Sequence, residues 1–227
     1  MTSKSLFDHT FMNSANLSRK ERERLMRRQA MLEAARAVFA EKGYANATLE
    51  EIAQRAEFGK GTLYNYFPGG KDELFFAVFE EVFAQFQELI DAAFTPAASF
   101  REGFEAFVRA SFAFFAQHHE VLLLVMRESQ RMLLSPEPER AAFFQDQYNR
   151  VVQHLSRHIQ GAIERNEVKP LPPEAVAHTL IGNLHGIHMH LMLKACQHLP
   201  AQRQALIDSE AAAHFLCTLL LEGLLKP

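Results

Sequence analysis

The sequence predicts an all-α protein of about nine helices, and three observations indicate that class. Apolar residues recur at helical spacing along most of the chain. No stretch shows the apolar and polar alternation of a half-buried strand. Glycine and proline divide the 227 residues into segments of helical length, and the hydrophobic content of 48% suffices for a core.

The first predicted helix runs from about Arg19 to Lys42, where Gly43 ends it as a C-cap. Its apolar side chains fall on one face, which predicts burial of that face. They are Met31, Ala34, Ala35 and Val38. Residues 1–18 are polar with scattered phenylalanine, and we expect them to form a flexible N-terminal extension.

Two short helices joined by a tight turn are predicted next. Thr48 and Glu51 form a capping box that opens the first of them, which ends near Ala56. The turn Glu57-Phe58-Gly59 leads to the second, from Lys60 to Phe67. This order is typical of a helix-turn-helix, in which the second short helix lies in the major groove of DNA.

The rest of the chain predicts longer helices separated by proline, glycine and capping residues. Ser99 and Glu102 form a second capping box, and Asn166 is a plausible C-cap. The expected helices cover about residues 71–94, 100–118, 120–133, 136–166, 174–198 and 202–225.

The charge is distributed unevenly along the chain. Residues 1–70 hold 11 Lys and Arg against 8 Asp and Glu, a net +3, and the rest holds 13 against 19, a net −6. The basic residues are densest in 19–28. A basic end on an acidic body indicates an anionic partner at that end, although charge alone is equally compatible with a solvated helix face.

The second short helix has one apolar face and one face rich in hydrogen-bond donors. Leu63 and Phe67 are expected to face the core. Gly61 permits a close approach to DNA, hydroxyl groups suit phosphates, and Asn65 suits a base edge. The predicted DNA-binding residues are Thr48, Lys60, Gly61, Thr62, Tyr64, Asn65, Tyr66 and Lys71.

In residues 34–44, 48–56 and 61–74 the chain resembles the TetR family of bacterial transcriptional regulators. The resemblance implies a helix-turn-helix DNA-binding domain at 19–70 and a helical ligand-binding and dimerisation domain at 71–227. It also implies a regulator and not an enzyme. We expect a sequence-specific repressor that a small hydrophobic or aromatic ligand releases from double-stranded operator DNA.

Three features depart from the family's pattern. Glu57-Phe58-Gly59 stands where the family usually has Gly-Val-Ser, so Glu57 must tolerate the backbone of the turn or the turn differs. Gly59 also replaces a serine N-cap, and the loop at 68–70 is one residue longer than the commonest form. These departures bear on operator sequence and affinity and leave the class unchanged.

The second domain is rich in phenylalanine. Fourteen of the 20 phenylalanines lie between Lys71 and Phe144, where they could line an apolar ligand cavity or serve as ordinary core. We expect a pocket among them, with polar contacts from later helices. The predicted ligand-binding residues are Phe104, Phe107, Phe115, Arg127, Phe144, His185 and His188.

Histidine supplies the alternative interpretation. His185, His188 and His190 are closely spaced, and His154 and His158 are four residues apart. No cysteine or carboxylate is grouped with them in the sequence, so we expect neither a metal site nor a cofactor. The alternative function is a helical metal- or haem-binding protein or enzyme that uses the 185–190 cluster.

The last two predicted helices are apolar, and Gly182 and Gly186 flatten one face of the first of them. Such helices can form a four-helix bundle with a second copy, although they could also pack within one subunit. We therefore expect a homodimer through these helices. The longest apolar run, 121–126, is too short to span a bilayer, so we expect no membrane partner. Cys196 and Cys217 form no paired motif, which indicates a reducing cytosol, so we expect a cytoplasmic protein.

Overall fold

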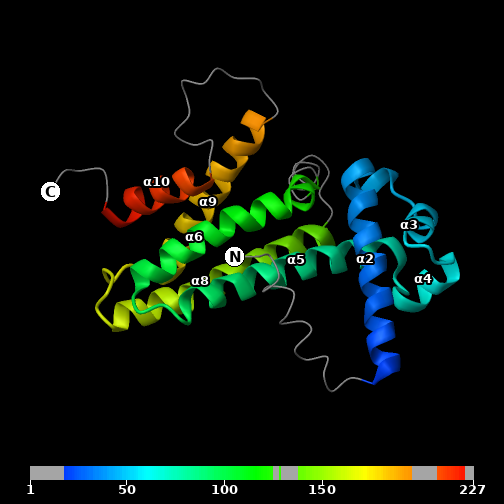
Figure 1. Cartoon of the computed structure of the whole chain (residues 1–227), viewed down its shortest axis with the longest axis horizontal. Coiled ribbons are helices and arrows are strands. Elements are labelled where there is room, and N and C mark those ends of the chain that lie inside the picture. The colour runs from blue at the N-terminus through cyan, green and yellow to red at the C-terminus, as the bar shows by residue number, and fades with distance from the viewer. Residues whose placement is uncertain (1–17, 125–127, 129–137, 196–208, 223–227) are drawn as a thin grey trace. The chain divides into compact units, whose positions relative to one another are not determined.

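The computed structural model describes residues 18–124, 128, 138–195 and 209–222, and in these ranges the chain is helical with no strand (Figure 1). This confirms the all-α class. The first helices are α2 (Arg19–Asn46), α3 (Leu49–Arg55), α4 (Lys60–Tyr66) and α5 (Gly70–Phe94). They are followed by α6 (Phe100–Gln117), α8 (Pro138–Glu164), α9 (Pro173–Ala195) and α10 (Ser209–Glu222). Residues 119–124 are also helical. The expected extension at 1–18, except Ser18, and the ends of several expected helices lie outside the described residues.

The chain forms two compact units, one ending at Phe79 and the other beginning at Glu80. The division therefore falls inside α5 and not at its start, where the sequence placed the domain boundary. The first part of α5 has its contacts with the N-terminal unit because its apolar side chains complete that core.

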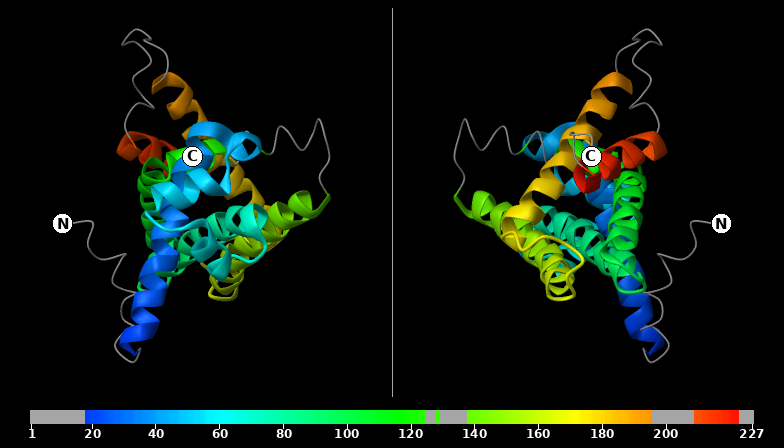
Figure 2. Two further views of the ribbon diagram at one scale, coloured as in Figure 1. Left: turned by 90° about the vertical axis from the view of Figure 1, so that its right-hand side faces the viewer. Right: turned by 90° about the vertical axis from the view of Figure 1, so that its left-hand side faces the viewer.

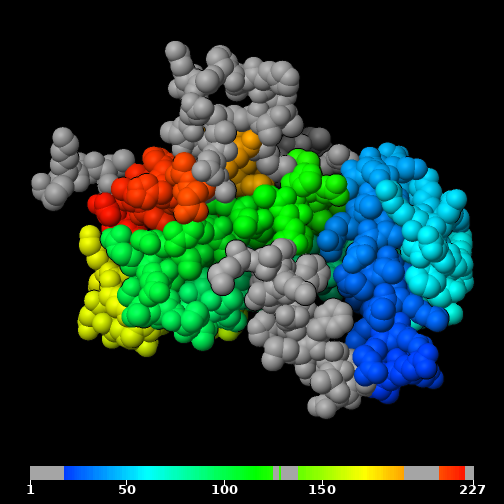
Figure 3. Space-filling view, viewed as in Figure 1, coloured from blue at the N-terminus to red at the C-terminus, as the bar shows by residue number. Residues whose placement is uncertain are grey.

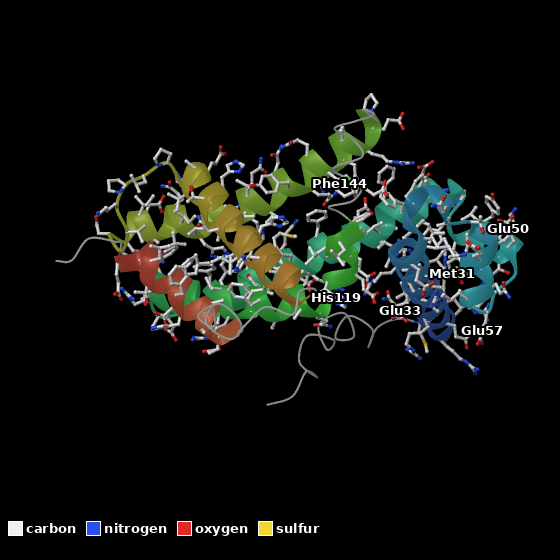
Figure 4. The ribbon with its side chains drawn as sticks, turned by 90° about the horizontal axis from the view of Figure 1, so that it is seen from above. Met31, Glu33, Glu50, Glu57, His119 and Phe144 are labelled. Atoms are coloured by element: carbon white, nitrogen blue, oxygen red, sulfur yellow. The ribbon has the colours of Figure 1, made fainter. Side chains whose placement is uncertain are left out.

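In the N-terminal unit the two short helices α3 and α4 pack with the long helix α2 (Figure 1). Met31 of α2 is fully buried among them (Figure 4). Phe75, from the first part of α5, packs edge-on against Phe39 and Tyr44, with ring centroids 5.5 and 4.9 Å apart. Gly43 has a positive φ of 73°, which breaks the helix where the sequence placed its C-cap.

The predicted capping box of α3 is present. Thr48 Oγ1 accepts a hydrogen bond from the Glu51 N–H at 3.3 Å, and the Glu51 carboxylate accepts one from the Thr48 N–H at 3.2 Å. The same reciprocal pair joins Ser18 and Glu21 at the start of α2. The box at Ser18 has the sequence pattern of a capping box, Ser-x-x-Glu, but the sequence analysis did not identify it.

The turn between α3 and α4 keeps its left-handed residue although that residue is not glycine. Glu57 has φ of 60°. The Glu57 N–H donates to the Gln54 carbonyl and the Phe58 N–H to the Ala53 carbonyl, at 3.1 and 2.9 Å. This hydrogen-bond pair defines a Schellman motif. Of the two outcomes expected from the sequence, Glu57 thus adopts the strained backbone and the turn is retained.

In the second unit α9 packs against α8 (Figure 2), and α10 packs against α6 (Figure 3). The core between them is rich in phenylalanine. Its buried aromatic side chains include Phe86, Phe100, Phe104, Phe107, Phe112, Phe114 and Phe115.

The helix ends of the second unit agree with the sequence in one case and differ in another. Asn166 has φ of 57° just beyond α8, as a C-cap residue should. Ser99 caps α6 by accepting from the Glu102 N–H, but the Glu102 carboxylate accepts from the Ala98 N–H, not from Ser99. The second capping box is therefore shifted by one residue. Among the helices described, none is both long and apolar enough to cross a membrane.

Candidate functional site

Helix α4, called the recognition helix below because the sequence predicts that it lies in the major groove of DNA, has one buried and one exposed face. Leu63 and the residue that follows the helix, Phe67, are 0% and 1% exposed, so they anchor α4 in the core as expected. The opposite face carries predicted DNA-binding side chains and backbone: Lys60, Gly61, Tyr64 and Asn65 are exposed, and Thr62 and Tyr66 are half-buried. The fold thus brings six of the eight predicted residues onto one short helix.

Lys60, the first residue of α4, is paired with a carboxylate from the preceding helix. Its Nζ donates a hydrogen bond to Glu50 Oε1 and lies 5.9 Å from the centroid of the Tyr64 ring. The hydrogen bond with Glu50 raises the pKa of Lys60, which keeps the ammonium charged. The same contact lowers the pKa of Glu50. The pair orients Lys60 but also places a negative charge next to the cation that is predicted to meet phosphate.

Two glycines leave the backbone at the start of α4 without side chains over it. Gly59 is the N-cap and makes no side-chain capping bond, as its replacement of serine implied. A Cβ on the exposed Gly61 would meet nothing within 4 Å. The backbone of this turn is therefore accessible to a large partner, which is the property that a close approach to DNA requires.

Two arginines of α2 lie beside the recognition helix, and sequence reasoning missed this arrangement. The guanidinium of Arg24 is 6.0 Å from the centroid of Tyr66, and that of Arg28 is 5.2 Å from the centroid of Phe67. The available signal was the basic stretch at 19–28, which the sequence analysis related only to an anionic partner at this end of the chain. The structure shows this stretch as the exposed first turns of α2, next to α4.

The remaining two predicted DNA-binding residues have structural contacts of their own. Thr48 is exposed and caps α3. Lys71 donates from Nζ to the carbonyl oxygens of Tyr44 and Ala47 at 3.0 and 3.1 Å, and it lies 4.4 Å from the Tyr44 ring centroid. Its ammonium thus stabilises the segment between α2 and α3. A contact between Lys71 and DNA would have to form beside these hydrogen bonds or replace them. Their DNA-binding role stays a prediction.

Two of the predicted ligand-binding residues are fully buried in the core. Phe104 and Phe107 are 0% exposed. Phe107 contacts Phe86 and Phe94, with centroids 6.0 and 5.9 Å away, and Phe104 stacks on Phe100 at 6.0 Å. These contacts correspond to the core-packing alternative.

Two other predicted ligand residues lie elsewhere in the chain. Phe144 is half-buried on α8 and packs edge-on against Phe143 (Figure 4). Arg127 lies outside the described residues. Nothing in these positions tests a ligand contact.

Phe115 and His188 are brought together from α6 and α9. Their ring centroids are 4.7 Å apart, and both side chains are buried. Burial, assisted by the neighbouring His185 and His119, lowers the pKa of His188 to about 4, so this imidazole is neutral near pH 7. Within the described residues, its buried Nε2 has no hydrogen-bond partner. A buried polar atom without a partner is costly, and a ligand could satisfy it.

The 185–190 histidines do not form a three-ligand group in the described part of the chain. His185 and His190 are exposed, whereas His188 is buried. Possible metal ligands converge instead at Asp91, His154 and His158, within 4.8 Å of one another. On α9, an open hollow of ≈ 380 Å³ is lined by His178, Thr179, Gly182, Asn183, Gly186 and Ile187.

Two family models match the chain. Residues 31–78 match the bacterial regulatory proteins of the tetR family, which covers the helix-turn-helix. Residues 104–197 match the tetracyclin repressor-like C-terminal domain. The chain belongs to the TetR family. It is thus a DNA-binding transcriptional regulator, as the resemblance in residues 34–74 implied.

Curated relatives agree with this assignment. Over 157 residues, the chain is 27% identical to the HTH-type transcriptional regulator YhgD of Bacillus subtilis, covering 68% of this chain and 78% of that protein. Over 113 residues it is 31% identical to the HTH-type transcriptional repressor KstR2 of Mycobacterium tuberculosis, covering 48% of this chain and 54% of that protein.

A solved structure shows the same fold at low sequence identity. The transcriptional regulator FadR from Bacillus subtilis, in complex with stearoyl-CoA, superposes with a TM-score of 0.71. The match covers 87% of this chain and 99% of that one at 20% identity. This likeness shows that the two proteins share one fold over 87% of this chain.

Proposed function

We propose that this TetR-family regulator is a cytoplasmic repressor that binds operator DNA as a homodimer and is released by a small hydrophobic ligand. The observation that carries the DNA contact is the two-faced recognition helix. Leu63 is fully buried, while Lys60, Gly61, Tyr64 and Asn65 stand exposed on the other side of the same short helix. A rigidly anchored helix with an exposed polar face is what major-groove recognition requires.

A dimer supports this function because two recognition helices can then meet half-sites about 34–36 Å apart. The exposed hollow on α9 includes Gly182 and Gly186, where small residues allow another helix to approach closely. We propose this face and α10 as the dimer interface. Sedimentation velocity at micromolar concentration tests it, and a monomer would refute the homodimer.

The ligand site is proposed next to Phe115 and His188. This place combines aromatic surface with a neutral imidazole whose Nε2 is without a partner among the described residues. A neutral buried imidazole fits an uncharged polar group on a largely apolar ligand. Because a protein of the same fold was solved with stearoyl-CoA, a long-chain acyl-CoA is the first probe, with free coenzyme A as the matched control.

The DNA-binding experiment uses the promoter fragment next to the protein's own gene, measured by fluorescence anisotropy at several salt concentrations. Lys60→Ala and Tyr66→Ala should weaken binding to all fragments, and Lys60→Ala should lower the salt slope by up to about 0.9. Lys169→Ala, which removes an exposed lysine of the second unit, is the control. Binding that does not depend on salt, or that neither α4 variant changes, would refute the interface.

Ligand release is tested on the same complex. Stearoyl-CoA should dissociate the wild-type protein from DNA, and His188→Phe should need a higher concentration, whereas free coenzyme A should have no effect. Release by coenzyme A alone would assign recognition to the headgroup and not to an apolar pocket. If no acyl-CoA releases the protein while DNA binding is intact, acyl-CoA is excluded as the ligand class. Other apolar compounds are then tested in the same way.

A further inference from the structure

Three metal-ligating side chains meet in the second unit, where the long helices α5 and α8 lie together. Asp91 is near the end of α5, and His154 and His158 are on α8. Asp91 Oδ1 lies 2.8 Å from His154 Nε2 and 3.0 Å from His158 Nε2. Both imidazoles therefore direct the same ring nitrogen at a single carboxylate oxygen.

The two histidines are placed for this by helical geometry. They are four residues apart, so they project from one face of α8, one turn after the other. Two histidines at this spacing on a helix are a familiar pair of metal ligands, to which a carboxylate from elsewhere is added. The sequence could not show Asp91 as their partner, because it lies more than sixty residues earlier.

Hydrogen bonding within the cluster is incomplete. His158 Nε2 forms a hydrogen bond with Asp91 Oδ1, but His154 Nε2 does not, despite its 2.8 Å separation from the same oxygen. His154 Nε2 is a buried nitrogen without a hydrogen-bond partner among the described residues. A single carboxylate oxygen thus forms a hydrogen bond with one imidazole, and the second imidazole nitrogen lies close to the same oxygen without hydrogen-bond geometry.

The orientation of His158 is held by packing that does not involve the cluster. Phe94 stacks on the His158 ring with centroids 5.0 Å apart. Phe94 can occupy this position only because α6 has Gly103 there, since a Cβ on that residue would come within 2.6 Å of Phe94 Cδ1. A fixed imidazole loses little freedom when it binds an ion, which favours affinity.

We propose that Asp91, His154 and His158 form a binding site for a divalent transition metal ion, with Zn²⁺ as the ion that fits best. Two imidazole nitrogens and one carboxylate oxygen suit Zn²⁺ far better than Mg²⁺ or Ca²⁺, which prefer oxygen ligands. Water completes the coordination shell, because the Asp91 side chain is 51% exposed. The sequence led us to expect no metal site.

Coordination requires a small rearrangement that the cluster permits. Zn²⁺ holds its nitrogen and oxygen ligands at about 2.0–2.2 Å. In a tetrahedral shell this separates the ligand atoms from one another by roughly 3.3 Å. The half-exposed Asp91 can move by the few tenths of an ångström that this needs. His158 exchanges the proton on Nε2, through solvent, for one on Nδ1, so that a neutral imidazole presents Nε2 to the ion. The bound ion then ties α5 to α8.

The test titrates Zn²⁺ into tag-free, chelator-dialysed full-length protein by calorimetry, with Mg²⁺ as a parallel titrant. The wild type should bind one equivalent of Zn²⁺ per chain. At a hundredfold excess over the Kd, Zn²⁺ should raise the Tm by about 5–10 °C. Asp91→Asn and His154→Gln should each weaken Zn²⁺ binding by at least the roughly tenfold to hundredfold that follows loss of an outer-shell partner. The double variant His154→Gln/His158→Gln should abolish it.

Matched controls separate this site from the other histidines. His185→Gln and His178→Gln should retain the wild-type stoichiometry and affinity, and circular dichroism of the metal-free variants checks that each is folded. Co²⁺ gives a second readout, because its visible absorption reports nitrogen and oxygen coordination and should disappear in the double variant. Loss of Zn²⁺ binding in His185→Gln but not in Asp91→Asn would overturn the proposal, as would no binding at 100 µM Zn²⁺.

Discussion

The ammonium of Lys60, at the start of the recognition helix, is paired with the carboxylate of Glu50 on the helix before it. This contact links α3 to α4 across the turn. It also sets an acidic side chain beside a cation on the face that is proposed to meet the phosphate backbone. Since DNA repels carboxylates, Glu50 is expected to limit affinity while it orients Lys60.

Glu50→Gln should therefore strengthen DNA binding. Removing the negative charge frees the Lys60 ammonium for phosphate, so the affinity should rise and the salt slope should become steeper by up to about 0.9. Anisotropy titrations between 50 and 200 mM salt measure both. Glu33→Gln is the control because Glu33 is an exposed carboxylate of α2 in the same unit. An equal gain in both variants would show a general charge effect in place of a local one.

Gly61→Ala separates the stability of α4 from its contact with DNA. The added methyl group meets nothing within 4 Å, and alanine favours the helix by about 0.5–1 kcal/mol over glycine. The variant should therefore be at least as stable in urea unfolding. Its DNA affinity should fall on the order of tenfold, because the methyl group occupies space that a closely approaching DNA backbone needs. Unchanged affinity would mean that DNA does not approach α4 at this residue.

Glu57→Gly should stabilise the protein. Glu57 holds a φ of 60° in the Schellman motif after α3, a conformation that costs a side-chain-bearing residue about 1 kcal/mol relative to glycine. Urea unfolding should show a gain of that order. Gln54→Gly, on the exposed face of α3, should lose about 1 kcal/mol and serves as the opposite control. A loss in Glu57→Gly would indicate that its side chain makes a stabilising contact.

Lys71→Ala should destabilise the N-terminal unit. Its ammonium donates to the carbonyl oxygens of Tyr44 and Ala47. Hydrogen bonds to charged groups contribute about 1.5–3 kcal/mol, so a loss in this range is expected in urea unfolding. Lys20→Ala, on the exposed start of α2, controls for the loss of charge. If Lys71→Ala left stability unchanged but weakened DNA binding, the ammonium would contact DNA and would not stabilise the folded protein.

His188 should make stability depend on pH in a defined window. Burial lowers the pKa of His188 to about 4 in the folded protein, against about 6.5 when unfolded. Between these values the unfolded chain binds more protons than the folded one, so acid destabilises the fold. The contribution should reach about 2 kcal/mol at pH 5 relative to pH 7.

The variant His188→Leu isolates this effect. Urea unfolding at pH 7 and pH 5 should show a smaller loss of stability in the variant than in the wild type. The neighbouring His185 and His119 are present in both proteins, so the two proteins differ only at position 188. Equal losses in the two proteins would show that His188 is solvated and titrates normally.

Features that arise from neighbours along the chain could be predicted from the sequence. The capping box of Thr48 and Glu51, the break at Gly43 and the buried pair Leu63 and Phe67 all follow from spacings of three or four residues. Helix ends and helical faces are decided by hydrogen bonds and burial at this range. The helix-turn-helix was predictable for the same reason, since its turn and caps lie within one short segment.

The partners of individual side chains depend on packing between segments that are distant in sequence. The sequence presented Lys71 as a cation for DNA, and the fold supplies it with carbonyl oxygens more than twenty residues earlier. It presented Phe104 and Phe107 as cavity lining, and neighbouring helices enclose them as core. Asp91 meets His154 and His158 only because α5 and α8 pack together. Local spacing by itself determined the helices, and the motif in residues 34–74 carried the resemblance to the family. Only tertiary packing decided which polar groups are satisfied, because burial and partnership are set where helices meet.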